Sequence, residues 1–366
     1  MSTQVLPTST RVWVVQHHAE GAIKLTKPYG TSEADTFALK TQELPSADAL
    51  PENSLLVQTL AISNDPVQRI WIDKVNKFDR PDMQPLNEGT PFHAYTLSKV
   101  IAVGGAQDGK FKIGDLVTGR SRWAEYAVLE KGSVQSVQRL SGLNPTVWLG
   151  ALGLSGLTAY WGLVAACELK QSDTLVVSGA AGSVGNVAVQ YAKKVMNIKR
   201  VVGIAGSDEK CKWLLSIGAD AAVNYKNSTF EKDLKEATPD GVDVFFDNIA
   251  GWILDAVIAR MNTHGVVICC GIMSGYGDAK GMAAISNYGL VLMNRIRIQG
   301  FSVIDHVAQF EDSTKALADA VNSGKLIVEG AETIVDVSGK FEDIPRVWTG
   351  LFEGANTGKL ITKLAD

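Results

Sequence analysis

A glycine-rich turn is the segment of this chain whose residue types most clearly suit a ligand. It reads Ser178-Gly179-Ala180-Ala181-Gly182-Ser183-Val184-Gly185. A tight strand-to-helix turn needs positions without a side chain, and the amide N–H groups at a helix start suit a pyrophosphate. The apolar run Leu175–Val177 predicts a strand before the turn, and spaced apolar residues from Val184 to Val195 predict a helix after it. We therefore predict a dinucleotide site; the alternative is a turn without a ligand.

The end of the second predicted strand indicates which dinucleotide would bind. NAD-binding folds place a carboxylate there, on the ribose 2′-hydroxyl, but this chain has Gly203-Ile204-Ala205-Gly206. Ser207 and Lys210 follow, and a lysine in the first turn of a helix could contact a 2′-phosphate. The acids Asp208 and Glu209 suit the first turn of a helix after a serine N-cap. The pattern favours NADP(H); the alternative is that Lys210 is an ordinary surface lysine.

Residues that could bind a metal do not cluster in the sequence. A catalytic zinc needs converging His, Cys and carboxylate ligands, and a structural zinc needs four closely spaced thiolates. No cysteine precedes Cys167, and no Gly-x-Ser-x-Gly motif of a serine hydrolase is present. The histidines are each isolated, apart from one pair at a predicted strand end: His17, His18, His93, His264 and His306. We therefore predict no metal centre.

Composition favours a globular protein of a reducing compartment. The 366 residues are 46% hydrophobic and 20% charged, and 35 scattered basic residues against 39 acidic ones leave no basic stripe for nucleic acid. Four cysteines, two of them adjacent, do not form a disulfide framework. The polar start, residues 1–11, lacks the apolar stretch of a secretory signal. We expect a cytoplasmic protein.

One uncharged segment, residues 140–167, is long enough to span a bilayer. Five glycines and Asn144-Pro145 interrupt it, so a buried short helix is favoured over a membrane span.

The chain divides into two kinds of pattern. Short β-type runs separated by Pro and Gly turns fill the N-terminal third, and from Leu152 strand and helix patterns alternate, which is typical of a parallel sheet. A helical stretch through about Ser323 and a final strand at 359–362 follow. We therefore predict an α/β fold in which an irregular β domain accompanies a doubly wound, six-stranded parallel sheet. Its strands are expected at Thr174–Ser178, Arg200–Ile204, Ala221–Asn224, Val242–Asp247, Val266–Cys270 and Arg295–Gly300.

A set of motifs spread over nearly the whole chain resembles one family. The chain is similar to the medium-chain dehydrogenase/reductase superfamily, and within it to the zinc-free prostaglandin reductases, leukotriene B4 dehydrogenases and alkenal double-bond reductases. Together these motifs are more specific than any one of them. Besides the glycine-rich turn and residues 203–210, the motifs are Asp65-Pro66-x-x-Arg69, Leu152 to Tyr160, Asn224-Tyr225-Lys226, Phe246-Asp247-Asn248, Cys270 to Tyr276, Arg295 to Phe301, and Asn356-Thr357-Gly358-Lys359.

The resemblance implies a domain layout and a set of cofactor contacts. Residues 1–148 with 319–366 would form a GroES-like catalytic domain, and 149–318 a Rossmann domain. A homodimer would form through the edge strand near residues 295–301. The implied NADP(H) contacts are Gly182, Ser183, Val184, Gly185, Gly206, Ser207, Lys210, Tyr225, Asn248, Cys270, Gly271, Ile272, Ser274, Tyr276, Phe301, Ser302, Val303 and Asn356.

The resemblance also implies a reaction. NADPH would deliver hydride to the β-carbon of an α,β-unsaturated ketone or aldehyde, and the developing enolate oxygen would need a hydrogen-bond donor. Tyr276 aligns with the family's active-site tyrosine, and a neutral phenol is a donor at pH 7. The alternatives are that Tyr276 only lines the nicotinamide pocket, or that Tyr288 or a ribose hydroxyl is the donor.

Two departures from the family pattern border the expected substrate cleft. Val67-Gln68 stands where a Tyr-Met pair is usual, and Gly277-Asp278 stands where Asn is common. Because of these differences, the substrate of any one family member cannot be assigned to this chain. Quinone reduction, and NADPH binding without turnover, remain alternative functions.

Overall fold

The computed structural model describes residues 5–74, 83–105, 109–276 and 285–366. The chain divides into two compact units. The first contains Met1–Leu149, Ile334–Ala355 and Leu360–Asp366, and the second contains Gly150–Thr333 and Asn356–Lys359. That the boundaries 148/149 and 318/319 delimit two domains stays a prediction.

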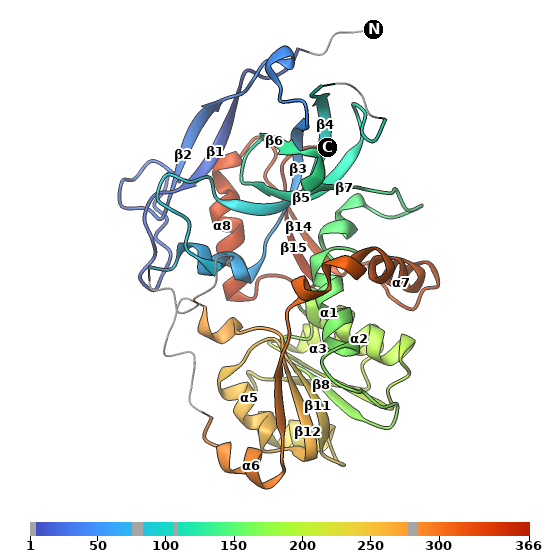
Figure 1. The fold of residues 1–366 in the computed structure, drawn as a ribbon. Coiled ribbons are helices and arrows are strands. Elements are labelled where there is room, and N and C mark those ends of the chain that lie inside the picture. Colours follow the sequence, from blue (N-terminus) through green and yellow to red (C-terminus); the bar gives the residue numbers. More distant parts are fainter. Residues whose placement is uncertain (1–4, 75–82, 106–108, 277–284) are drawn as a thin grey trace. The chain divides into compact units, whose positions relative to one another are not determined.

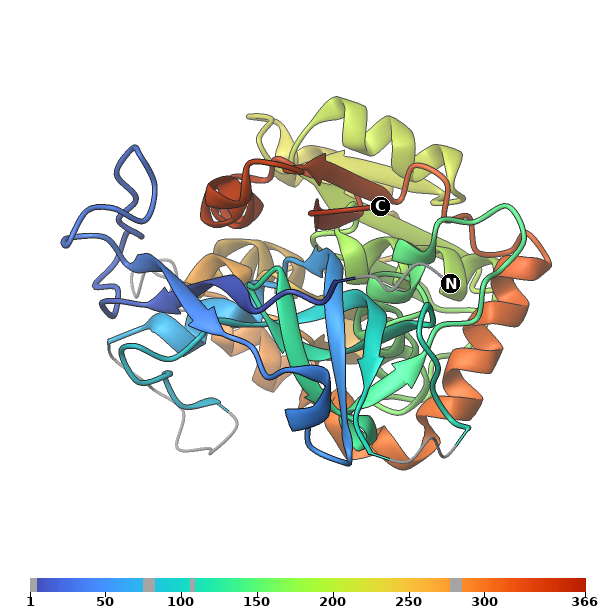
Figure 2. The same ribbon diagram turned by 90° about the horizontal axis from the view of Figure 1, so that it is seen from above.

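An antiparallel sheet organises the first unit. Its strands run in the order β14-β15-β3-β4-β5-β7, with β6 also paired to β3, and Figure 2 shows the strands coloured blue to green beside one another. A separate two-stranded ribbon pairs β1 with β2, and helix α8 (Ile344–Thr349) lies beside this ribbon (Figure 1). The strand bounds are β1 Ser9–Val15, β2 Phe37–Glu43, β3 Ser54–Ser63, β4 His93–Val103, β5 Leu116–Arg122, β6 Tyr126–Glu130, β7 Val134–Ser136, β14 Glu332–Asp336 and β15 Lys359–Lys363.

A six-stranded parallel sheet in the order β10-β9-β8-β11-β12-β13 organises the second unit. The strand order reverses at β8, so the crevice at the carboxyl ends of the strands is where such a sheet binds its ligand. The predicted α/β class with six parallel strands is confirmed. The bounds are β8 Thr174–Val177, β9 Arg200–Ala205, β10 Ala221–Asn224, β11 Val242–Asp247, β12 Met261–Cys269 and β13 Arg297–Gly300, with helices α1 Leu154–Val164, α2 Ser183–Gln190, α3 Asp208–Ser216, α4 Phe230–Ala237, α5 Gly251–Ile258, α6 Tyr288–Met293 and α7 Phe310–Asn322.

Two predicted strand starts were wrong. The last strand begins at Arg297 and not at Arg295, because Arg295 has a left-handed backbone (φ 52°). The fifth strand begins at Met261, which pairs with Val242 before a register shift, and not at Val266. Polar residues and a glycine between Met261 and Val266 hide that start from a periodicity argument.

The uncharged segment 140–167 folds into a short 3-10 helix, Pro145–Leu149, and the 11-residue α1. In the described part of the chain, no helix has both the length and the apolar character needed to cross a bilayer.

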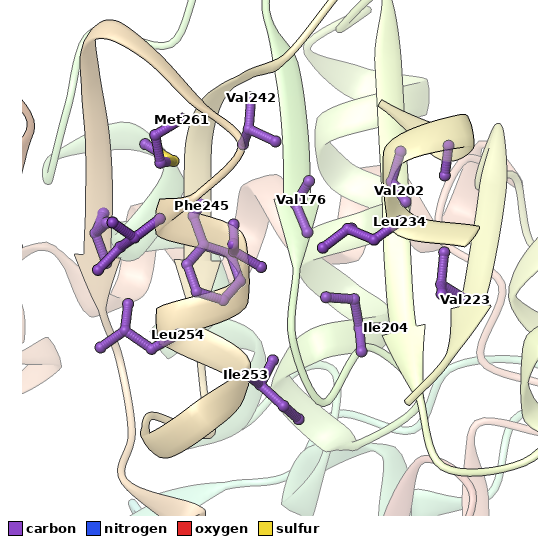
Figure 3. Packing of buried hydrophobic residues seen from close by; sticks show 14 of the residues in the cluster. Val176, Val202, Ile204, Val223, Leu234, Val242, Phe245, Ile253, Leu254 and Met261 are labelled. Atoms are coloured by element: carbon purple, nitrogen blue, oxygen red, sulfur yellow. The ribbon is translucent and has the colours of Figure 1, made fainter. Parts of the chain in front are cut away.

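Apolar side chains between the sheet and its helices form the core of the second unit. Figure 3 shows Val176, Val202 and Phe245 from the strands in one layer with Leu234 and Ile253 from the helices. Each of these five side chains is at most 2% exposed. This packing fixes the strands, and therefore fixes the loops that leave their carboxyl ends.

Candidate functional site

The glycine-rich turn leaves β8 and enters α2, as predicted. Gly179 has φ +57°, and a Cβ on Gly185 would lie 2.4 Å from the carbonyl oxygen of Gly179. Gly182 is the N-cap of α2, and a Cβ there would lie 3.1 Å from the same oxygen. Gly179 and Gly185 are therefore required by the backbone path of the turn, whereas a side chain at Gly182 would make only a tight contact.

Ser183, the first residue of α2, carries an unsatisfied hydroxyl. Its Oγ is buried and has no hydrogen-bond partner among the described residues. A buried polar atom without a partner is costly, and its position at a helix N-terminus suits an anionic ligand oxygen. The turn therefore fits the pyrophosphate of a dinucleotide.

Two lysines, Lys210 and Lys226, lie near each other beyond the end of β9. Ser207 caps α3 by accepting a hydrogen bond from the Lys210 amide at 3.2 Å. Burial, and then the nearby charge of Lys226, lower the pKa of Lys210. The carboxylate of Asp208 accepts a bond from Asn224 Nδ2 at 2.7 Å, in agreement with a structural role for that acid.

Tyr225 packs against the Gly206 backbone beside these lysines. A Cβ on Gly206 would lie 3.0 Å from the phenol oxygen of Tyr225. Lys226 was absent from the predicted contacts, although it stands in the Asn224-Tyr225-Lys226 motif and is close enough to repel Lys210. Two lysines, Lys210 in the first turn of α3 and Lys226 just after β10, fit a 2′-phosphate better than the single predicted one.

The loop after β12 carries Tyr276 and is held by the backbone that follows β11. The N–H groups of Cys270 and Gly271 donate to the Asp247 carbonyl at 2.8 and 3.0 Å. A Cβ on Gly271 would lie 2.8 Å from the Asn248 carbonyl oxygen, so only glycine allows this approach. Ser274 donates to the Ile249 carbonyl through both its N–H (3.0 Å) and its hydroxyl (2.7 Å).

Tyr276 is half-buried at the end of this loop, whereas Tyr288 is 67% exposed. Burial first, and then the Cys270 thiol, raise the pKa of Tyr276 to about 12. The phenol therefore stays protonated at neutral pH and can donate a hydrogen bond to a developing oxyanion. Of the two candidate phenols, Tyr276 has the more desolvated environment.

Phe301, Ser302 and Val303 leave the carboxyl end of β13, as expected from the strand order. Phe301 packs edge-on to Phe246 of β11, with ring centroids 6.3 Å apart, and Ser302 is the N-cap of a 3-10 helix that begins at Val303. A Cβ on Gly162 of α1 would lie 2.8 Å from the Phe301 ring. Packing on both sides fixes this segment beside the other strand ends.

Asn356 reaches the site from the C-terminal part of the chain. Its side chain is 8% exposed, and its Nδ2 donates to the Gly358 carbonyl at 2.6 Å. Gly358 forms a parallel bridge with Gly182, and its N–H donates to the Ala181 carbonyl at 2.7 Å. Asn356 is thus held beside the glycine-rich turn, although it lies 171 positions after Gly185 in the sequence.

The predicted site residues of the second unit therefore converge on one region. They lie at the carboxyl ends of β8 to β13, joined there by the segment 356–359. Glycines with no space for a Cβ, an unpartnered serine hydroxyl and two lysines together fit NADP(H). Within the described residues, no group of three or more His, Cys, Asp or Glu side chains converges as metal ligands.

The two departures from the family pattern have different outcomes. Gln68 is buried and holds the local backbone: its Oε1 accepts from the Asp65 N–H at 2.7 Å and its Nε2 donates to the His93 carbonyl at 2.8 Å. Gly277-Asp278 lies outside the described residues.

Comparison with known proteins gives the family. Residues 183–321 match the family described as "Zinc-binding dehydrogenase", and residues 22–137 match "N-terminal domain of oxidoreductase". The chain is 35% identical to the putative NADP-dependent oxidoreductase YfmJ of Bacillus subtilis, over 93% of this chain and 96% of that protein. It is 32% identical to the NADP-dependent 2-alkenal reductase of Nicotiana tabacum, over 86% of this chain and 88% of that protein.

A solved structure agrees with these relatives. CurA of Vibrio vulnificus, crystallised with NADPH, superposes with a TM-score of 0.82 at 27% identity, covering 97% of this chain and 99% of that one. The motifs, the strand order and the sequence identities lead to one conclusion: the chain belongs to the zinc-independent, NADP-dependent double-bond reductase family of the medium-chain dehydrogenases/reductases.

Proposed function

We propose that this protein reduces the carbon-carbon double bond of α,β-unsaturated ketones or aldehydes with NADPH. NADPH, when bound, supplies the hydride that adds to the β-carbon. The likeness to a 2-alkenal reductase supports an enal or enone as the acceptor. The observation that carries the proposal is the half-buried phenol of Tyr276, held at the same strand ends as the glycine-rich turn.

Tyr276 has the properties that carbonyl activation requires. Addition to the β-carbon moves negative charge to the carbonyl oxygen, and a phenol with a pKa of about 12 remains a neutral donor throughout the physiological range. We propose that the proton that completes the α-carbon comes from solvent. Tyr276 thus stabilises the enolate oxygen by a hydrogen bond and does not transfer its proton fully.

Other residues of the chain would hold the cofactor. The amide groups of Gly182 to Gly185 and the Ser183 hydroxyl would bind the pyrophosphate, and Lys210, with Lys226, would bind the 2′-phosphate. The loops at Asn248, Cys270–Tyr276 and Phe301–Val303, together with Asn356, would enclose the nicotinamide end.

A panel of acceptors tests this function. Purified protein with NADPH is expected to convert enals, enones and aryl butenones to their saturated carbonyl products, which mass spectrometry identifies. A simple quinone serves as the comparator. Turnover of the quinone with no turnover of any unsaturated carbonyl would favour the alternative function, quinone reduction, and NADPH binding with no turnover at all would favour a binding protein.

We also propose a homodimer that pairs the edge strand β13 with its copy in a second chain. All four residues of β13 are exposed, and in the described part of the chain only β12 pairs with this strand. Ile298 (42%), Leu292 (75%) and Met293 (68%) add exposed apolar surface. Light scattering is expected to give twice the mass of the chain, and Ile298→Lys to give a monomer; a monomeric wild type would contradict the dimer.

Cytoplasmic localisation stays part of the proposal. The four free thiols of the described chain suit a reducing compartment. Fractionation of the source cells is expected to recover the protein in the cytosol, and recovery with membranes would contradict this.

A further inference from the structure

Asp247, the last residue of β11, is a buried carboxyl group that no step of the proposed reaction uses. It is 2% exposed. Its Oδ1 accepts hydrogen bonds from Ser178 Oγ at 2.7 Å and from the Ile249 N–H at 3.0 Å. The Ala250 N–H donates to both carboxylate oxygens, at 3.0 and 3.1 Å. Such a carboxylate is expensive to bury, and hydrogen bonds to both of its oxygens offset that cost.

Ser178 connects this carboxylate to the glycine-rich turn, since Gly179 follows it directly. Its hydroxyl donates to Asp247 and accepts the Asn248 N–H at 2.9 Å. Asn248 Nδ2 in turn donates to the Ser178 carbonyl at 2.7 Å. The start of the turn is therefore fixed by three bonds to residues 247 and 248.

The same segment carries the loop of Tyr276. The Asp247 carbonyl accepts the N–H groups of Cys270 and Gly271, and the carbonyls of the next two residues accept those of Met273 and Ser274. The side chain of Asp247 thus faces the turn and the start of α5, and its backbone faces the loop. One residue contacts both halves of the site.

The backbone beside Asp247 adopts a conformation that the carboxylate must maintain. Ala250 has φ +64°, a left-handed value that is unfavourable for a residue with a Cβ, and Gly251 follows with φ +61°. Such conformations persist where surrounding interactions determine them, and they cluster at functional sites. Here the interaction is the bifurcated bond from the Ala250 N–H to both oxygens of Asp247.

We propose that Asp247 is a positioning residue that fixes the glycine-rich turn and the Tyr276 loop relative to each other. It contacts the turn through Ser178 and the loop through residues 270–274. The proposal rests on the proposed function only for the role of Tyr276. The effect of Asp247 on the glycine-rich turn can be measured by NADPH binding alone, without the proposed reaction.

Asp247→Asn tests the proposal, because it keeps the shape but turns one acceptor into a donor that faces an N–H group. Asp243→Asn is a matched control on the same strand. Its carboxylate accepts bonds from the Thr174 N–H and Asn262 Nδ2, both 2.8 Å, but at the amino end of the sheet. Asp247→Asn is expected to raise the NADPH dissociation constant at least tenfold and to lower kcat with an enone at least tenfold. Asp243→Asn is expected to change both less than twofold.

A second pair of variants separates positioning from stability. Ala250→Gly in the Asp247→Asn background relieves the left-handed strain, so it is expected to recover Tm without recovering NADPH affinity. If it recovers both, the carboxylate only stabilises the fold and the proposal is overturned. Should Asp247→Asn not fold, Ser178→Ala removes the link to the turn alone, and an unchanged NADPH dissociation constant in that variant overturns the proposal.

NADPH binding, followed by fluorescence, requires no substrate. A wild type that binds NADPH but reduces no enone therefore contradicts the proposed function and leaves the binding test of Asp247 intact. Equal effects of Asp247→Asn and Asp243→Asn on NADPH binding contradict the role of Asp247 and leave the proposed function intact.

Discussion

The N–H of Gly358 donates a 2.7 Å hydrogen bond to the carbonyl oxygen of Ala181, so a residue near the C-terminus holds the peptide that precedes the N-cap of α2. Gly358 has φ +68°, and a Cβ on it would lie 1.8 Å from the Ala331 carbonyl oxygen. The orientation of the N–H groups that would bind the pyrophosphate therefore depends on a position with no space for a side chain.

Gly358→Ala is expected to weaken NADPH binding at least tenfold, because the added methyl group displaces the segment from Ala181. Gly324→Ala is the matched control: its φ is +71°, but a Cβ there would meet nothing within 4 Å. Both variants carry the cost of a left-handed alanine, and only the first carries the collision. Equal NADPH affinities in a fluorescence titration would show that Gly358 does not support the turn.

Lys210→Ala is expected to raise the dissociation constant of NADPH about tenfold or more and to leave that of NADH nearly unchanged. A charge-assisted bond to a phosphate contributes about 1.5–3 kcal/mol, and 1.4 kcal/mol corresponds to a factor of about ten. Lys226→Ala is expected to act in the same direction. The control is Lys212→Ala, an exposed lysine on the same helix. Equal losses for the two cofactors would exclude the 2′-phosphate assignment.

Ser183→Ala tests the unpartnered hydroxyl. The variant is expected to bind NADPH more weakly by about tenfold or more, because a hydrogen bond to a charged phosphate oxygen contributes about 1.5–3 kcal/mol. Its thermal stability without cofactor is expected to equal or exceed that of the wild type, because the alanine removes a buried polar atom that has no partner in the described chain. Unchanged NADPH affinity would mean that the hydroxyl does not face the cofactor.

His93 gives a prediction about acid stability. Burial first, and then Arg120 and Arg122, lower the pKa of His93 to about 4. Between about pH 6.5 and about pH 4, the unfolded chain, in which the histidine has its ordinary pKa of about 6.5, binds more protons at this position than the folded chain. His93 therefore destabilises the fold as pH falls from about 6.5 to about 4. His93 Nδ1 lies 2.9 Å from Arg120 Nη2 and accepts its bond, since a guanidinium only donates.

Urea unfolding of the wild type and His93→Gln between pH 7 and pH 4 measures this contribution. The wild type is expected to lose more stability than the variant across that window. Parallel pH profiles would show that His93 titrates normally in the folded protein.

The sequence predicts the parts of the site that local chemistry determines. The glycine-rich turn, the missing carboxylate after β9 and the capping serine each require only neighbouring residues, and the structure places them as predicted. The sequence did not single out Lys226, Asp247 or Gly358, because their proposed roles depend on contacts made after folding. By residue type alone they are a surface lysine, a strand-end acid and a loop glycine. The start of β13 was wrong for a similar reason, because the left-handed Arg295 is not a feature that periodicity detects.

Tyr276→Phe tests the proposed role of the phenol. Loss of one donor to a developing oxyanion typically costs about 10²–10³ in kcat. The expected result is a decrease in kcat of this order with NADPH affinity retained, because the loop backbone bonds do not involve the phenol. Tyr288→Phe, at the 67% exposed position, is the control and is expected to retain full activity. Unchanged kcat in Tyr276→Phe would assign the donor elsewhere.

The proposed reaction is tested most directly by the fate of the transferred hydride. NADPH that carries deuterium at its hydride position is incubated with the protein and an enone, and NMR locates the label in the product. Reduction of the carbon-carbon double bond is expected to give a saturated ketone with deuterium on the β-carbon. Deuterium on the former carbonyl carbon, in an allylic alcohol, would show that the protein reduces the carbonyl group and would contradict the proposed function.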